Sequence, residues 1–172
     1  MNVLPQNLTH LCFGKEYKQE ISENVLPLSL KYLSFRDCLN FDHEFKINVL
    51  PKNLTHLCVS YYYNGQIMNI PDSVTHMYFW NCNENMVFPT SLNTLYFNGY
   101  NNLLNLPNTL EEIIFFSLKV PFDNLPFFVK KVVMVNITEG NIKFVKKIPH
   151  GCKIVNFDNK EIKEIELNSN HV

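Results

Sequence analysis

The chain has 172 residues and a mass of 20.2 kDa, which suits a single domain with a full hydrophobic core. Charged residues make up 18% of it and the formal net charge is −1, so we expect neither nucleic acid nor a membrane surface as a partner. No apolar run is long enough to cross a bilayer, and the first residues lack the basic and apolar regions of a secretory signal. These features predict a cytoplasmic protein.

Amino-acid usage favours strands and irregular segments over helices. The chain contains no alanine, which is the best helix former, and 24 asparagines, which favour turns and caps. The five cysteines form no Cys-x-x-Cys pair, and without a secretory signal we expect them to be reduced. Composition therefore predicts a mainly β protein with little helix.

A ten-residue pattern recurs along the chain, with apolar-Pro-x-x-apolar-x-x-apolar-x-aromatic as its common form. Eight of the nine prolines fall in this frame, Pro121 being the exception, and successive framed prolines are 18 to 24 residues apart. Eight aligned copies indicate a repeat architecture. We assign residues 1–172 to one solenoid domain whose repeats start near Leu4, Leu26, Leu50, Ile70, Phe88, Leu106, Leu125 and Ile148.

Each repeat predicts one short strand. The last two apolar positions are two residues apart, which is the period of a strand with one buried face. Proline cannot donate a ladder hydrogen bond, so it belongs just before the strand. The shortest repeats leave about ten residues for the return path, too few for a helix and two turns. Stacked repeats therefore predict a leucine-rich-repeat-like solenoid with a parallel sheet on one face and extended, 3₁₀ or irregular return segments.

Stacking places equivalent apolar residues in two internal columns. The first is expected to contain Leu11, Leu33, Leu57, Met77, Leu95, Ile113, Val132 and Val155. The second is expected to contain Phe13, Phe35, Val59, Phe79, Phe97, Phe115, Met134 and Phe157.

The two ends of the predicted solenoid differ in whether they can be capped. Asp158 and Asn159 form a turn signal before an alternating tail, so we expect residues 158–172 to fold back as a hairpin that caps the last repeat. The first repeat opens at Leu4, which leaves little room for a cap. We expect either a monomer that tolerates this exposed edge or a dimer paired through it.

Two repeats carry the leucine-rich-repeat string, as Leu30-x-x-Leu33-x-Phe35-x-x-Cys38 and Val74-x-x-Met77-x-Phe79-x-x-Cys82. The combination Leu-Pro-x-Ser/Asn-Leu-Thr-His-Leu-x-Phe, with Tyr63-Asn64-Gly65-Gln66-Ile67 before the next proline, more closely resembles the FNIP repeat. That family is a leucine-rich-repeat relative abundant in social amoebae and in giant DNA viruses that infect amoebae. The resemblance covers roughly residues 3–157.

This resemblance implies a binding protein without established catalytic residues, in the host cytoplasm if the gene is viral. Many family members carry an F-box before the repeats and recruit substrates to a ubiquitin ligase. Because the first repeat opens at Leu4, we expect no F-box here. The alternative that the resemblance leaves open is a substrate-recognition or decoy component linked to ubiquitin-ligase machinery.

The side of the sheet away from the core, called the strand face below, is the candidate binding surface. Alternation along each strand points the neighbours of the column residues outward. Tyr, Trp and Arg are enriched where proteins bind proteins, although aromatic side chains also stabilise neighbouring strands. We predict that an unidentified protein binds here through Tyr32, Arg36, His56, His76, Tyr78, Trp80, Tyr96, Ile114 and Phe116.

A metal site is the competing interpretation of the histidines and cysteines. His56, Cys58 and His76 come from adjacent repeats, and Cys82 is the nearest further ligand. Structural zinc sites have four ligands with tight local spacing, which this set lacks. We expect no metal, and we expect Cys38 and Cys82 to be buried structural thiols.

Catalysis is not expected either. Glu111 and Glu112 are sequential and point to opposite faces of a strand, so they cannot act as an acid–base pair. The five glycines are scattered and form no phosphate-binding loop. The sequence therefore predicts a non-enzymatic protein without a cofactor.

Overall fold

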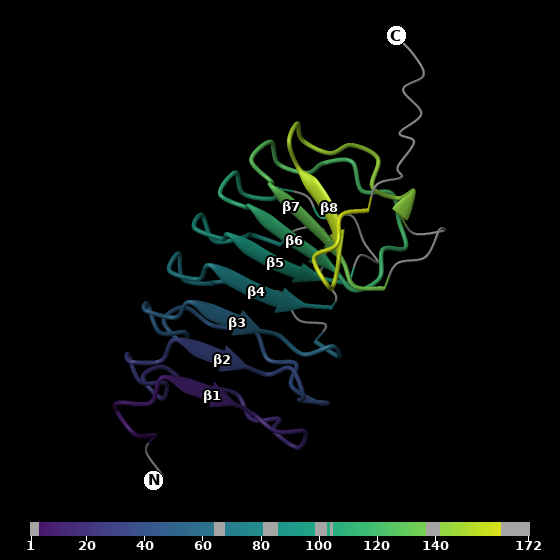
Figure 1. Cartoon of the computed structure of the whole chain (residues 1–172). Helices are drawn as coiled ribbons and strands as arrows, with labels where there is room; N and C mark the ends of the chain where they lie inside the picture. Colours follow the sequence, from purple (N-terminus) through teal and green to yellow (C-terminus); the bar gives the residue numbers. More distant parts are fainter. Residues whose placement is uncertain are drawn as a thin grey trace.

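The computed structural model describes residues 4–63, 68–80, 86–98, 103, 105–136 and 142–162. Its framework is one eight-stranded sheet in which every neighbouring pair is parallel and the spatial order follows the chain (Figure 1). The strands are β1 (His10–Cys12), β2 (Tyr32–Ser34), β3 (His56–Cys58), β4 (His76–Phe79), β5 (Thr94–Phe97), β6 (Glu112–Phe115), β7 (Lys131–Met134) and β8 (Lys153–Asn156). The predicted parallel-sheet solenoid is confirmed.

Every framed proline opens a β-turn. In all eight repeats the backbone N–H three residues after the proline donates to the proline carbonyl, at N···O distances of 2.9 to 3.1 Å. In the first seven repeats the strand begins five residues after the proline, as His10 follows Pro5. The conserved spacing within each repeat therefore corresponds to a turn that delivers the chain into the sheet.

In the second to sixth repeats, the side chain of the second residue after proline bonds to backbone of the preceding coil. The Ser29 hydroxyl lies 2.7 Å from the carbonyl oxygens of both Gln6 and Leu8, and Thr109 repeats this geometry at 2.8 Å four repeats further along the chain. A hydroxyl that serves carbonyls in the preceding coil satisfies polar backbone at the turns. The recurring Ser or Thr at this position thus ties neighbouring coils together.

Asparagine residues turn the chain ahead of the prolines. Asn24, Asn48, Asn69 and Asn105 all have φ between 57° and 63°, and each stands two or three residues before a framed proline. Asparagine tolerates this left-handed conformation better than most residues with a side chain. Part of the asparagine content is therefore explained by these turns.

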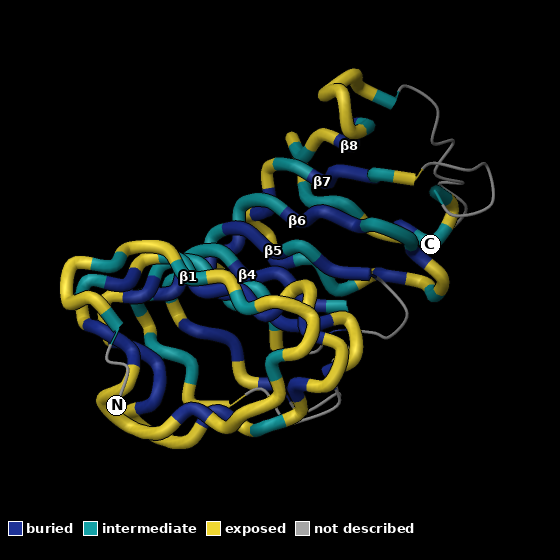
Figure 2. The backbone as a smooth tube through the Cα atoms, turned by 90° about the horizontal axis from the view of Figure 1, so that it is seen from below, coloured by how far each residue is buried: buried dark blue, intermediate teal, exposed yellow. Residues whose placement is uncertain are grey.

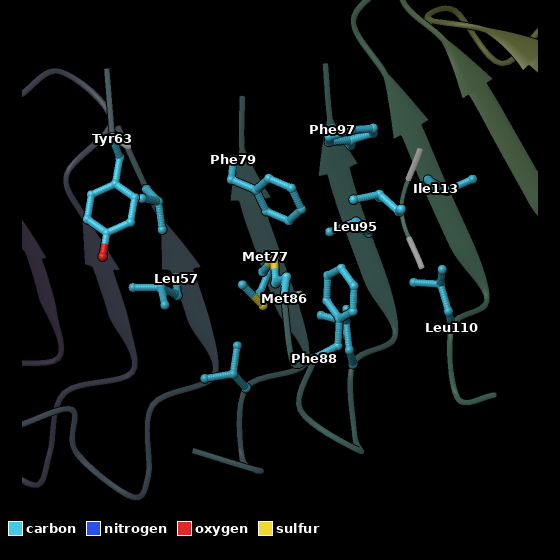
Figure 3. Packing of buried hydrophobic residues seen from close by; sticks show 14 of the residues in the cluster. Leu57, Tyr63, Met77, Phe79, Met86, Phe88, Leu95, Phe97, Leu110 and Ile113 are labelled. Carbon is cyan, nitrogen blue, oxygen red and sulfur yellow. The ribbon is translucent and has the colours of Figure 1, made fainter. Parts of the chain in front are cut away.

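The core lies between the sheet and the return segments. Leu33, Leu57 and Leu95 of the first internal column are fully buried, and so is Phe97 of the second. Figure 3 shows Phe79, Phe88 and Phe97 beside the strands, together with Leu57, Met77 and Leu95. Figure 2 shows buried residues along the strands, whereas exposed residues gather in the turns and along the return side.

The eighth repeat does not follow the predicted register. Val132 pairs with Ile154, and Val133 pairs with Val155. The expected column positions of Val155 and Phe157 are therefore wrong: Ile154 fills the first column, Val155 lies on the strand face, and Phe157 is 71% exposed. β8 begins four residues after Pro149 instead of five, and a slip of one residue moves every side chain to the opposite face.

The described return segments are mostly irregular, in agreement with the expected path, and an isolated parallel bridge joins Phe122 to Val145. At the carboxyl end the chain turns at Asp158 and Asn159, and Glu161 forms an antiparallel bridge with Val155 of β8. The remainder of the expected cap, residues 163–172, lies outside the described residues. Within the described ranges there is no helix with the length and apolarity needed to cross a membrane.

Candidate functional site

Parallel pairing arranges the strand face in two rows that run across all eight strands. The first row contains His10, Tyr32, His56, His76, Thr94, Glu112, Lys131 and Lys153. The second row contains Cys12, Ser34, Cys58, Tyr78, Tyr96, Ile114, Val133 and Val155.

The first row begins as a stack of rings. His10 stacks on Tyr32 with centroids 5.7 Å apart, and the His56 and His76 rings lie 4.2 Å apart at an interplanar angle of 13°. Thr55 places its hydroxyl 2.9 Å from His56 Nδ1, which orients the ring. Burial lowers the pKa of His56, and the neighbouring His76 and His10 lower it further. The neutral ring is therefore the favoured form of His56 in this stack.

The cysteine and tyrosine between these rings are not activated groups. Tyr32 Oη lies 3.5 Å from Cys58 Sγ, and this contact, together with burial, raises the pKa of Tyr32 to about 12. Burial also raises the pKa of the Cys58 thiol. A reactive cysteine needs a lowered pKa, so Cys58 is a packing and hydrogen-bonding group here.

Tyr78 is the centre of an aromatic cluster formed by Tyr61, Tyr78, Trp80, Tyr96 and Phe116. Its ring is 8% exposed and meets Trp80 and Phe116 edge-on, with centroids 6.1 and 5.4 Å away. Trp80 and Phe116 lie 5.2 Å apart at 30°, and Tyr61 packs edge-on against Trp80 at 5.1 Å. These residues come from four successive coils, those of β3 to β6, and meet on the strand face.

Arg36 lies beside this cluster. The carbon of its guanidinium group is 5.3 Å from the centroid of the Tyr78 ring, a distance at which a cation is attracted by the aromatic face. The backbone N–H of Arg36 donates to Ser34 Oγ at 3.2 Å, which holds the chain just after β2. Arg36 remains exposed.

A hollow of about 590 Å³ opens on the strand face over β2 to β6. Seven of the nine predicted site residues line it, namely Tyr32, Arg36, His56, His76, Tyr78, Tyr96 and Phe116. The remaining lining residues are Leu57, Cys58, Met77 and Phe157. The structure therefore brings most of the predicted residues to one concavity.

The other two predicted residues lie beside the hollow. Trp80 packs against both Tyr78 and Phe116, so it extends the aromatic cluster. Ile114 is 5% exposed and packs with Val133 and Val155 in a small apolar cluster on the strand face. Its burial makes Ile114 a packing residue of this face.

Two aromatic residues of the site were missed by the sequence analysis. Tyr61 lies three residues after the end of β3, and the run of three tyrosines from 61 to 63 was the available signal. Phe157 was assigned to the core, whereas the register slip of β8 releases it to line the hollow. The sequence gives no local sign of this register slip, because Pro149 and the apolar residues after it still fit the repeat frame.

Among the described residues, no three His, Cys, Asp or Glu side chains gather in a way that suits a metal ion, and Cys82 lies outside them. The carboxylates just before and at the start of β6 form ion pairs with the next coil. Glu111 lies 2.6 Å from Lys130 Nζ, and Glu112 lies 2.8 Å from Lys131 Nζ.

Cys38 is buried and its thiol donates to the Gly14 carbonyl at 3.4 Å, as suits a structural thiol.

An all-parallel sheet with one strand per coil and irregular return segments defines a leucine-rich-repeat-like solenoid. A sequence model of the FNIP repeat matches residues 1–38 and 41–82. These segments are FNIP repeats, so the resemblance seen in the sequence is confirmed for them. A search of curated proteins finds no significant match to the chain.

Proposed function

We propose that the protein is a non-catalytic interaction module that binds a protein partner on its strand face. The observation that carries this proposal is the hollow at Tyr78, where an arginine and several aromatic rings converge from separate coils. Aromatic residues and arginine supply most of the binding energy in protein interfaces. Solenoids commonly offer an extended surface of this kind to a partner.

Aromatic stacking between coils would by itself explain part of the strand face. The His56–His76 stack joins adjacent strands and suits such a structural role. Trp80 and Tyr61 differ, because both follow the ends of their strands, and Tyr61 is 47% exposed. Large rings left accessible beside a hollow favour binding over packing.

The state of four titratable groups on and beside the strand face supports a non-catalytic role. Cys58 and Tyr32 both have raised pKa values, and the carboxylates of Glu111 and Glu112 are held by lysines. A general acid or base works best with a pKa near the working pH and a free path to a substrate. These groups contribute to packing and to the ladder of ion pairs instead.

The test is partner capture from the native cell with a matched pair of variants. Trp80→Ala removes an aromatic ring from the cluster, whereas Phe127→Ala removes one that is 73% exposed in the turn before β7. We expect the first variant to lose the partners of the wild-type protein and the second to keep them, with unchanged circular dichroism for both. Identical partner sets for Trp80→Ala and the wild-type protein would contradict the proposal. Recovery of ubiquitin-ligase subunits would identify the partner class.

A further inference from the structure

We propose that the hollow binds an acidic peptide segment, with a carboxylate on Arg36 and a neighbouring apolar side chain against Trp80 and Phe116. This inference rests on the proposed function, because it names the chemistry of the partner at the same surface. Three features of the described residues carry it: the unpaired charge of Arg36, the accessible aromatic pair, and the short separation between them.

Arg36 is a cation without a carboxylate partner among the described residues. Lys46, Lys130 and Lys131 each form an ion pair with a glutamate, whereas Arg36, the single arginine of the chain, forms none with any described side chain. None of the described residues that line the hollow is Asp or Glu. The Asp37 carboxylate is near enough to raise the pKa of Tyr78, but Asp37 does not line the hollow and forms no ion pair with Arg36. The described lining therefore presents a positive charge that is complementary to a negative charge supplied from outside.

The guanidinium of Arg36 fits a carboxylate better than a phosphate group. A guanidinium presents paired donors that match the two oxygens of a carboxylate. Phosphate recognition on proteins generally uses a cluster of arginines, and Arg36 is the one Arg or Lys among the described residues that line this hollow. Burial and its histidine neighbours favour the neutral form of His56, so it adds no second positive charge at neutral pH.

Trp80 and Phe116 offer the apolar half of the site. Their rings are tilted by 30° to one another, both are partly exposed, and Tyr61 borders Trp80. Such a platform suits an aromatic or large aliphatic side chain from a partner, whose burial from water stabilises the complex.

Tyr78 sets the distance between the two halves. Its ring contacts the Arg36 guanidinium and also the Trp80 and Phe116 rings. The two subsites are thus separated by a single ring, and an extended peptide rises about 3.3 Å per residue. An acidic residue and an apolar residue one to three positions apart in the peptide would reach both.

The sequence preference is tested by selecting a phage library of random peptides, about twelve residues long, on the full-length protein. We expect enriched peptides to carry Asp or Glu one to three residues from Trp, Phe, Tyr, Leu or Met. The charge-reversed variant Arg36→Glu should select Lys or Arg in place of the acid. Lys52→Glu, which makes the same charge change in a turn away from the hollow, should select the same peptides as the wild-type protein.

The chain contains a single tryptophan, Trp80, so its fluorescence reports directly on the site. Titration of one enriched peptide should change the emission, and Arg36→Gln should weaken binding roughly 10- to 100-fold, as expected for a charge-assisted hydrogen bond. Replacing the peptide acid by its amide should weaken binding equally. The two changes together should add little to either alone. Lys52→Gln should leave the affinity unchanged.

Three outcomes would overturn this inference: no enriched peptide, enriched peptides without acidic residues, or an affinity insensitive to Arg36→Gln. Displacement of the peptide by inorganic phosphate at equal ionic strength would also overturn it, in favour of a phosphate site. Each of these leaves the proposed function standing if Trp80→Ala still loses the cellular partner. Retention of that partner by Trp80→Ala counts against the proposed function itself.

Discussion

The two halves of the strand face differ, although the coils beneath them are built alike. Over β1 to β4 the first row is a stack of histidine and tyrosine rings, whereas over β6 and β7 it is the Glu112–Lys131 ion pair. The second row changes from Ser34 and Cys58 to Ile114 and Val133. Inner positions must fill the same interior in every coil, so they stay apolar. Outer positions meet no such requirement and can form different surfaces.

Coil length also varies along the chain, and the return side absorbs the difference. Framed prolines are 22 and 24 residues apart at the start of the chain, 18 apart in the middle and 23 apart at the end. The longer coils near the start add aromatic residues to the core, where Tyr17, Phe41 and Tyr63 stack with centroids 6.0 and 6.3 Å apart. The sheet keeps its register, because the added residues follow the strand and never enter it.

The largest expected effect is on folding stability, when the same substitution is made in a regular coil and in the last coil. Phe97 and Phe157 both stand eight residues after a framed proline, but Phe97 is fully buried and Phe157 is 71% exposed. Phe97→Ala should lower the free energy of unfolding by about 3–5 kcal/mol, because it leaves a cavity in the core. Phe157→Ala should cost less than about 1 kcal/mol, as is usual at the surface. Urea denaturation measures both, and equal losses would contradict the register slip of β8.

The histidine stack predicts that folding stability depends on pH through a residue of the amino-terminal half, His56. The pKa of His56 is lower in the folded protein than in the unfolded chain, so the unfolded chain binds the proton more tightly. The contribution of His56 to stability should therefore fall as pH drops below its unfolded pKa of about 6.5. The melting temperature of the wild-type protein should drop more than that of His56→Gln on acidification from about pH 7.5 to about 5.5.

His150→Gln is the control for that experiment, since His150 is exposed in the turn before β8 and outside the stack. It should keep the acid sensitivity of the wild-type protein. The same pH dependence in wild-type and His56→Gln proteins would show that the stack does not sense the charge.

The smallest effect is expected in the carboxy-terminal half of the first row. Glu112→Gln removes the partner of Lys131, an ion pair whose side chains are 30% and 36% exposed. Partly exposed pairs contribute about 0.2–1 kcal/mol, and salt screens them. The variant should lose stability in low salt and match the wild-type protein in high salt. A loss that persists in high salt would indicate a packing role for Glu112.

Much of the site could be predicted because strand alternation is a local property. Once Leu57 was assigned to the core, His56 and Cys58 had to point outward, and the structure places both on the hollow. The same rule led to Tyr78 and Tyr96. Tyr61 could not be reached in this way, because it lies beyond the end of its strand, where alternation no longer applies. Binding by these residues stays a prediction.

The sequence by itself determined the repeat, its proline turns, the inner columns of the first seven coils and the outward rows, since each follows from spacing within about ten residues. Only the tertiary structure decided that Ile154 and not Val155 enters the last column, and that Arg36 lies over Tyr78. Arg36 and Tyr78 belong to coils that are not even adjacent. Contacts of this kind depend on how successive coils stack and curve, which no single repeat encodes.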